Sequence, residues 1–374
     1  MRIAILHNDD FAHLPQGVDR KSQDAILDVV VAFERALKAR GAQVDVHPIG
    51  ADPFAIDRSA FSDAPDLVFN LCESFAGDAR GELIVPALLD LLGVPYTGSG
   101  PLTLALALHK HKAKEILRGR SIPTPEFALV EQLEELSRLE VPLPAIVKPA
   151  REDASIGIDR LSLARDEKEL AWACARVLTE RRQPALVERY IEGRELNVAL
   201  LGTVEGKGAP EVLPISEIDF SRLASDHPRI ITYAAKWDES APEFYTTEPK
   251  PCVLPEAELA RVRDVATRAF KALELRDYGR VDMRLAADGT PYVIEVNPNC
   301  DLSPDAGFAR AARAAGMDHE ALVWRLVDIA RSRHARPSTV VERPGEPLAD
   351  APRDRRVPPG RGELRDGAGP PGAR

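Results

Sequence analysis

The chain has 374 residues, of which 44% are hydrophobic and 29% charged, a composition typical of a globular protein with two or three domains. Its formal net charge of −10 at pH 7 argues against a nucleic-acid partner, because neutralising phosphates requires a basic surface. Four widely separated cysteines without a CxxC pair indicate neither a disulfide framework nor a zinc site. No apolar run reaches the roughly 18 residues of a membrane span or forms a signal-peptide core, so we expect a cytoplasmic protein without a membrane partner.

A parallel α/β domain is predicted over residues 1–118, because apolar runs alternate with helical periodicity. The predicted strands lie at 2–7, 43–46 and 66–71, and the predicted helices at 26–37 and 82–92. The segment 7–10, His-Asn-Asp-Asp, follows the first strand at the edge where open α/β sheets bind ligands. No GxGxxG motif follows this strand, which excludes a typical dinucleotide site.

The next predicted helix, 103–117, carries three lysines, Lys110, Lys112 and Lys114. Lysines at these positions occupy more than one face of a helix, so at most two of them can point into a shared cleft. A solvated basic helix explains the same pattern, and the sequence does not decide between the two. The proline-stiffened segment 121–127 predicts the first domain boundary.

A second domain is predicted over residues 119–205. A buried strand ends near Lys148, and the loop after it, 150–157, consists of small and polar residues. Backbone N–H groups of such a loop can bind phosphate oxygens, with Lys148 as a point charge, and an ordinary turn is the alternative. Two further strands carry Glu188 and Glu195.

A third domain is predicted over residues 206–336. It should contain strands at 211–220 and 230–233, a polar loop at 234–240, and helices at 255–273, 308–315 and 319–331. The remaining segment, 337–374, is rich in Pro and Gly and nearly free of apolar side chains, which predicts a disordered tail.

Within the third domain, alternating runs at 280–285 and 291–296 flank Asp288-Gly289, a pair that favours a two-residue turn with positive φ angles. Such a turn places Asp282 opposite Glu295, and Arg280 opposite Asn297. Residues two apart in a strand share a face, so all four side chains project the same way.

Two carboxylates facing each other across a hairpin repel, so a cation is expected between Asp282 and Glu295. With the amide oxygen of Asn297, they form the kind of oxygen ligand set that Mg²⁺ prefers when water and phosphate complete its coordination. The alternative is an exposed hairpin face on which Arg280 simply neutralises the acids.

Taken together, these segments resemble the ATP-grasp superfamily, and within it the D-alanine–D-alanine ligase branch. The resemblance covers about residues 67–327. It rests on five short motifs that occur in the family's order: LGVPYTGSG at 92–100, IVKP at 146–149, VERYIEGRE at 187–195, GRVD at 279–282 and IEVN at 294–297.

The resemblance implies a three-domain ATP-grasp fold of the α/β (α+β) class. Residues 1–118 would form an N-terminal parallel α/β domain, 119–205 a small central α+β lid, and 206–336 a catalytic α+β subdomain. It also implies a ligase that uses ATP and Mg²⁺, or Mn²⁺ in its place, to join a carboxylate to an amine through an acyl-phosphate. The partners would be small amino-acid-like substrates, and a homodimer is a family-level expectation.

Matching positions in the motifs imply residue roles. The implied ATP ligands are Lys110 and Lys148 for the phosphates, Ser155 in the loop over them, Glu188, Tyr190 and Ile191 for adenine, and Glu195 for the ribose. Asp282, Glu295 and Asn297 would hold Mg²⁺, in agreement with the hairpin pattern. Ser155 would also serve catalysis, together with Lys236, which would reach the γ-phosphate, and Arg280, which would stabilise the oxyanion when the amine attacks.

The chain departs from D-alanine–D-alanine ligases where that family recognises its substrates. Segment 7–10 lacks the family's glycine-rich turn and its ammonium-binding glutamate. Ala154 replaces a serine, Trp237 a tyrosine, and Asp301 a glycine. We therefore expect the ATP machinery to be retained and the substrate specificity to be altered.

Three carboxylates, Asp9, Asp10 and Glu73, are candidates to replace the missing ammonium ligand. The leading hypothesis is a ligase for amino-acid-like substrates other than two D-alanines. A true D-alanine–D-alanine ligase is one alternative, and an inactive nucleotide-binding or regulatory protein is another.

Overall fold

The computed structural model describes residues 1–9, 20–50, 65–204 and 208–334. Residues Met1–Arg336 form one compact unit, and the fold and the site below belong to it. The predicted tail at 337–374 and the candidate Asp10 lie outside the described residues.

A three-stranded parallel sheet opens the chain, in the order β2-β1-β3. Its elements are β1 (Arg2–Asn8), β2 (Gln43–Ile49) and β3 (Leu67–Asn70), with helices α1 (Arg20–Ala39) and α2 (Ile84–Leu92). Alternate residues of β1 face opposite sides, so Ile3 and Ile5 pack with α1 while Ala4 and Leu6 pack with α2. The predicted strands and helices of this segment are therefore present.

The helix predicted at 103–117 is wrong as a single element. It is divided into α3 (Pro101–Leu108) and α4 (Lys110–Gly119), because His109 leaves the helical region with φ −82° and ψ 75°. The N–H of Lys110 then donates to the carbonyl of Ala150 at 3.3 Å instead of continuing α3. The break ties the start of α4 to the loop that begins at Ala150.

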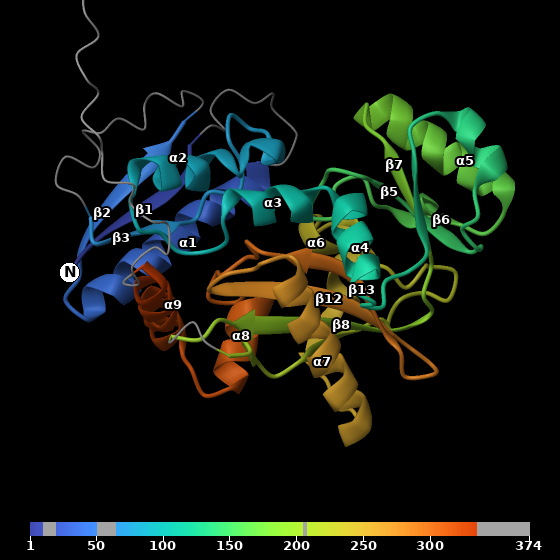
Figure 1. The fold of residues 1–374 in the computed structure, drawn as a ribbon. Helices are drawn as coiled ribbons and strands as arrows, with labels where there is room; N and C mark the ends of the chain where they lie inside the picture. Colours follow the sequence, from blue (N-terminus) through green and yellow to red (C-terminus); the bar gives the residue numbers. More distant parts are fainter. Residues whose placement is uncertain (10–19, 51–64, 205–207, 335–374) are drawn as a thin grey trace, which may run out of the picture. The chain divides into compact units, whose positions relative to one another are not determined.

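A four-stranded antiparallel sheet follows in the order β4-β7-β5-β6. Its strands are β4 (Phe127–Val130), β5 (Ala145–Pro149), β6 (Leu163–Ala164) and β7 (Ala185–Arg189). Helix α5 (Glu167–Arg176), capped by the side chain of Asp166, covers one face and continues into a π-helical turn, Val177–Arg181 (Figure 1). Cys174 and Val177 pack with β5 and β7 in the core beneath it.

The third sheet contains six strands in the order β11-β10-β8-β12-β13, with β9 paired to β8. Its strands are β8 (Gly193–Leu201), β9 (Glu211–Val212), β10 (Ser216–Asp219), β11 (Glu248–Pro251), β12 (Tyr278–Ala286) and β13 (Pro291–Asn297). β7 belongs to the four-stranded sheet, whereas β8 pairs with β12 in the six-stranded sheet. The chain therefore passes from one sheet to the other between Arg189 and Gly193, before residue 205. The predicted domain limits at 118, 205 and 336 remain a prediction.

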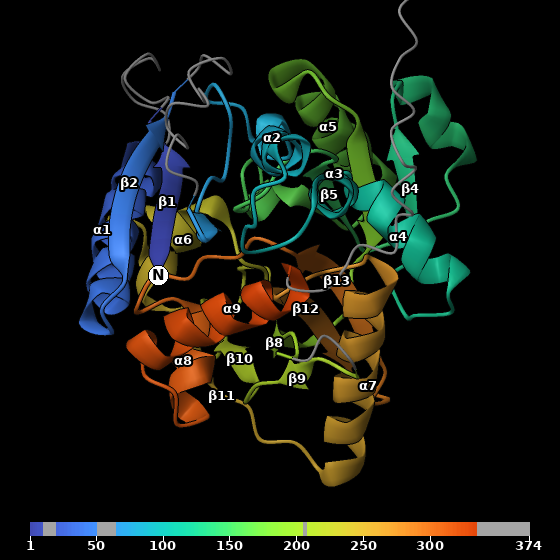
Figure 2. The same ribbon diagram turned by 60° about the vertical axis from the view of Figure 1, so that its left-hand side comes forward.

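Helices cover both faces of this sheet. Val198 and Leu200 pack with α7 (Glu256–Ala272), while Ala199 and Leu201 pack in the cluster with α8 (Gly307–Ala314) and α9 (His319–His334) (Figure 2). The strand predicted at 230–233 is wrong: the short helix α6 (Tyr233–Trp237) begins there, capped by the hydroxyl of Thr232, so Lys236 lies on a helix and not in a loop. Four 3₁₀ turns complete the described elements: Ala79–Gly81, Leu133–Arg138, Arg160–Ser162 and Pro242–Tyr245.

The β12–β13 hairpin has the predicted pairing near its open end but a different turn. Asp282 lies opposite Glu295, and Arg280 opposite Asn297. The turn is a three-residue loop in which Gly289 has φ 77°, and the N–H of Ala286 donates to the carbonyl of Thr290. The three-residue loop shifts the pairing by one residue from the predicted register. A β-bulge after Asp282 shifts it back by one residue, so the pairs that contain the polar residues are those that were predicted.

Helices long and apolar enough to cross a membrane were not found among the described residues.

Candidate active site

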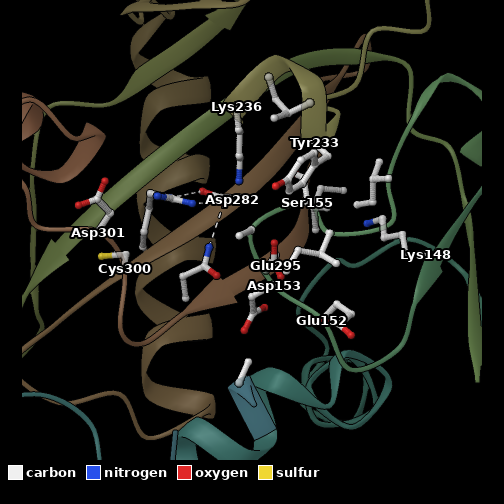
Figure 3. A pocket seen from close by; sticks show the side chains of 18 of the residues that line it. Lys148, Glu152, Asp153, Ser155, Tyr233, Lys236, Asp282, Glu295, Cys300 and Asp301 are labelled. Atoms are coloured by element: carbon white, nitrogen blue, oxygen red, sulfur yellow. Dashed lines mark hydrogen bonds and ion pairs between the residues drawn. The ribbon is translucent and has the colours of Figure 1, made fainter. Parts of the chain in front are cut away.

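A cavity of about 1230 Å³ is lined by residues from all three sheets and from α6. Of the residues predicted to bind ATP or metal or to serve catalysis, all except Lys110 line it, and Lys110 joins the site by bonding to Glu295. Figure 3 shows Lys236 pointing toward Asp282, with Glu295 and Asp153 beside each other below them. The predicted residues are therefore brought together in one place.

Asp282 is the most densely bonded carboxylate of the cavity. Arg280 donates to both of its oxygens at 2.7 and 2.9 Å, Asn197 donates to one at 2.7 Å, and Asn297 to the other at 3.0 Å. Burial opposes the charge on Arg280, but Asp282 outweighs this effect and raises the pKa of the guanidinium. Arg280 thus neutralises Asp282, as the alternative interpretation stated, although on a largely buried face.

Glu295 is bonded to a different cation. The ammonium group of Lys110 contacts Glu295 and also bonds Asp153 at 2.9 Å. Burial raises the pKa of Glu295, but Lys110 outweighs it and lowers the pKa to about 2. Asp282 and Glu295 thus lie on one hairpin with separate cationic partners.

Glu188 is held between two buried lysines. Lys148 bonds one carboxylate oxygen at 2.9 Å, and Lys114 lies 3.3 Å from the other. Burial raises the pKa of Glu188, but the two lysines outweigh it and lower that pKa below its ordinary value. The basic helix is therefore not simply solvated, because Lys110 and Lys114 are buried while Lys112 is exposed.

Lys114 and Arg284 were missed by the residue predictions. Arg284 is only 4% exposed, bonds Glu195 at 2.8 Å, and lies over the rings of Tyr190 and Phe220. Two signals in the sequence could have found them. Lys114 lies one helical turn after Lys110, and Arg284 lies two residues after Asp282, on the same face of the strand.

The loop at 150–157 has an unusual backbone. Ala154 and Ser155 adopt left-handed conformations with φ 53° and 62°, followed by Gly157 at φ 77°. Residues with a Cβ avoid this region, and such conformations concentrate at ligand-binding sites. Ser155 lines the cavity.

The family of the chain follows from comparison with known proteins. The family model described as "D-ala D-ala ligase C-terminus" matches residues 116–328. The chain belongs to the D-alanine–D-alanine ligase-like ATP-grasp family. The α/β fold class and the recognised family are therefore confirmed.

Individual relatives are identical to the chain at about a third of the aligned positions. It is 37% identical to the uncharacterized protein y4sG of Sinorhizobium fredii, covering 72% of the chain and 75% of the relative. It is 34% identical to a D-alanine–D-alanine ligase of Synechococcus, covering 67% and 73%. The crystal structure of D-alanine–D-alanine ligase from Bacillus anthracis complexed with ATP shares the fold with a TM-score of 0.67 and 24% identity, over 89% of this chain and 98% of that one.

Where this ATP-grasp ligase departs from the D-alanine–D-alanine pattern, the cavity carries acidic side chains. Glu73 and Asp301 line it, whereas Asp9 is exposed and is not among the lining residues. Asn8 holds the backbone of Glu73 in place by accepting its N–H at 2.7 Å. Within the described ranges, Glu73 forms no ion pair with a Lys, Arg or His side chain.

Replacing Glu73 with glutamine should stabilise the protein at neutral and higher pH. Burial, followed by repulsion from Asp301 and Asp153, raises the pKa of Glu73 from 4.5 to about 7. The folded protein therefore keeps a proton that the unfolded chain releases in this window, and stability falls as pH rises through it. We expect equal Tm values for the variant and wild type near pH 4.5 and a higher Tm for the variant at pH 8, measured by differential scanning fluorimetry. A Tm difference that does not change with pH would contradict this account of Glu73.

Proposed function

We propose that this protein is an ATP-dependent ligase that joins the carboxylate of one amino-acid-like substrate to the amine of another through an acyl-phosphate. The observation that carries the proposal is the cavity itself, which Lys148 and Lys236 line together with the polar hairpin residues, Arg280 among them. Phosphoryl transfer depends mainly on positioning and charge neutralisation, which is what this set of side chains can supply.

The residues at the hairpin fit a divalent cation. Asp282, Glu295 and the amide oxygen of Asn297 offer oxygen ligands, and the described residues contain no group of three or more His, Cys, Asp or Glu that could form a protein-only site. Mg²⁺ usually takes one or two carboxylates together with substrate phosphates and water. A bound Mg²⁺ would supply charge neutralisation at the phosphates, and Mn²⁺ is an alternative.

The residues of the chain would have separate roles in the two steps of the reaction. A substrate carboxylate oxygen attacks the γ-phosphorus of ATP, forming an acyl-phosphate and releasing ADP, while Lys236 neutralises the transferred group. The neutral amine of the second substrate then attacks the acyl carbon and Arg280 stabilises the resulting oxyanion. As the amide bond forms, the C–O bond to phosphate breaks, and the phosphate leaves with the proton that the amine loses. Lys148, Glu188 and Glu195 would bind the nucleotide and take no part in the chemistry.

Glu73 is our candidate for the carboxylate that binds the first substrate's ammonium group. It lines the cavity, and its pKa is raised first by burial and then by repulsion from Asp301 and Asp153, two carboxylates beside which a cation would be favourable. A substrate other than two D-alanines is supported by Ala154, Trp237 and Asp301, which all depart from the family pattern at the substrate end.

Two other functions have some support. The named relatives favour D-alanine–D-alanine ligation. The fold alone would also be consistent with an inactive nucleotide-binding protein. Such a protein would not need Arg280 or the other polar residues of the hairpin, all of which are present in this chain.

Product analysis distinguishes the three functions. The protein is incubated with MgATP and a panel of D- and L-amino acids, singly and in pairs, and phosphate release and product masses are measured. We expect ADP, phosphate and an amide product in equal amounts for a pair other than two D-alanines, with loss of turnover on EDTA addition and recovery with Mg²⁺. Stimulation by D-alanine alone would instead identify a D-alanine–D-alanine ligase, and no stimulation by any pair would favour the nucleotide-binding protein.

A further inference from the structure

Two hydrogen bonds join helix α6 to the loop at 150–157 and to Ile158, the residue that follows the loop. The backbone N–H of Tyr233, at the start of α6, donates to the carbonyl of Ile158 at 2.9 Å. The indole N–H of Trp237, at the end of α6, donates to the carbonyl of Ala154 at 3.1 Å. The helix that carries Lys236 is therefore attached through Trp237 to the loop that carries Ser155, and through Tyr233 to the residue directly after that loop.

The hydrogen bond from Trp237 is made to the part of the loop with the least favourable backbone conformation. Ala154 and Ser155 are consecutive residues with a Cβ in the left-handed region, and such a pair persists only where its surroundings hold it. The first residues of the loop are held separately, since Gln183 accepts the N–H of Arg151 at 2.8 Å. On the opposite side, the loop is held by the bond between Asp153 and Lys110.

The two positions joined by this bond are both departures from the D-alanine–D-alanine ligase pattern. Ala154 stands where that pattern has a serine, and Trp237 where it has a tyrosine. In this chain, neither side chain presents a hydroxyl group to a substrate. The indole instead donates to a backbone carbonyl, so in this chain the two departing positions are joined directly by a hydrogen bond between loop and helix.

We propose that Trp237 is a positioning residue that holds the 150–157 loop closed over the cavity and so fixes Ser155 relative to Lys236. The consequence for ATP rests on the proposed function. When the indole N–H is lost, the carbonyl of Ala154 loses its partner, the left-handed pair relaxes, and the loop opens more often. The loop then becomes more accessible to proteases. ATP binds less tightly, because part of its binding free energy is needed to close the loop.

The variant Trp237→Phe tests this role, because it removes the N–H and keeps an aromatic ring. Trp324→Phe is the matched control: the indole of Trp324 donates to the carbonyl of Ala36 at 3.0 Å, and neither residue lines the cavity. Both variants thus lose the same kind of hydrogen bond, one at the cavity and one between α9 and α1.

Two measurements are made on the full-length protein. Limited trypsin digestion without ligand, followed by mass spectrometry, gives the rate of cleavage after Arg151, and steady-state kinetics give the KM for ATP and kcat. For Trp237→Phe we expect about tenfold faster cleavage and about tenfold higher KM with a smaller change in kcat, the scale of one lost hydrogen bond. Trp324→Phe should match wild type in both.

Wild-type cleavage after Arg151 in Trp237→Phe would overturn the proposal, as would an equal acceleration at every tryptic site or an equal effect of Trp324→Phe. The digestion uses no nucleotide, so it tests the link even if the protein does not hydrolyse ATP. Faster cleavage after Arg151 without any ATP-dependent turnover would support the role of Trp237 while rejecting the proposed ligase function.

Discussion

Replacing Arg280 with alanine is expected to lower kcat by about 10²–10³-fold, the usual cost of removing one donor to an oxyanion. The guanidinium lines the cavity and is held in one orientation by two bonds to Asp282. Because Asp282 raises its pKa, Arg280 stays charged throughout the working pH range. Its charge is thus positioned before the reaction and need not reorganise when the oxyanion forms.

The measurement separates catalysis from binding. ADP affinity, determined by calorimetry, should stay within about threefold of wild type, because the interaction is made mainly in the transition state. Arg268→Ala is the control, since Arg268 lies partly exposed on α7, does not line the cavity, and donates to the backbone carbonyls of Arg120 and Ser121. Unchanged kcat in Arg280→Ala would remove Arg280 from the mechanism, and an equal loss of ADP affinity would assign it to ground-state binding.

The hairpin shows how far sequence pattern alone could lead. Alternation of apolar residues and the Asp-Gly pair predicted the strands and the pairing of Asp282 with Glu295. The same pattern predicted the wrong turn, because Asp288-Gly289 suits both a two-residue turn and a three-residue loop with a left-handed glycine. The bulge that restored the register depends on packing between strands, which a single strand's pattern does not encode.

Elements fixed by tertiary contacts were the ones that could not be predicted. His109 has no helix-breaking chemistry, and the break between α3 and α4 is tied to the bond from the N–H of Lys110 to the carbonyl of Ala150, in the loop after β5. Likewise, the apolar residues at 230–233 are typical of a strand, but the hydroxyl of Thr232 caps a helix there. Glu188, the carboxylate that pairs with Lys114, is likewise distant in sequence, so the pattern of the basic helix did not indicate which lysines are buried.

Replacing Glu188 with methionine is expected to reduce the free energy of unfolding by about 3–5 kcal/mol at pH 7, because it leaves two buried cations without their counter-charge. Lys114 and Lys148 are only 2% and 6% exposed, so they have little contact with water that could replace the carboxylate. The two lysines lower the pKa of Glu188, so its stabilising charge is present above pH 4.5 and is lost as pH falls through the lowered pKa. Urea unfolding should therefore show a large difference from wild type at pH 7 that shrinks in strong acid.

Glu126→Met provides the matched control, because Glu126 pairs with Arg189 at 2.5 Å on an exposed part of the neighbouring strand. An exposed pair of this kind contributes about 0–1 kcal/mol. A further variant in which Lys114, Lys148 and Glu188 are all methionine should recover most of the lost stability, since a buried ionic group replaced by apolar residues is often neutral. That variant should still fail to bind ATP, which would indicate that the three charges are kept for the nucleotide. If it is as unstable as Glu188→Met, the group is required for folding, and a role specific to the nucleotide does not follow.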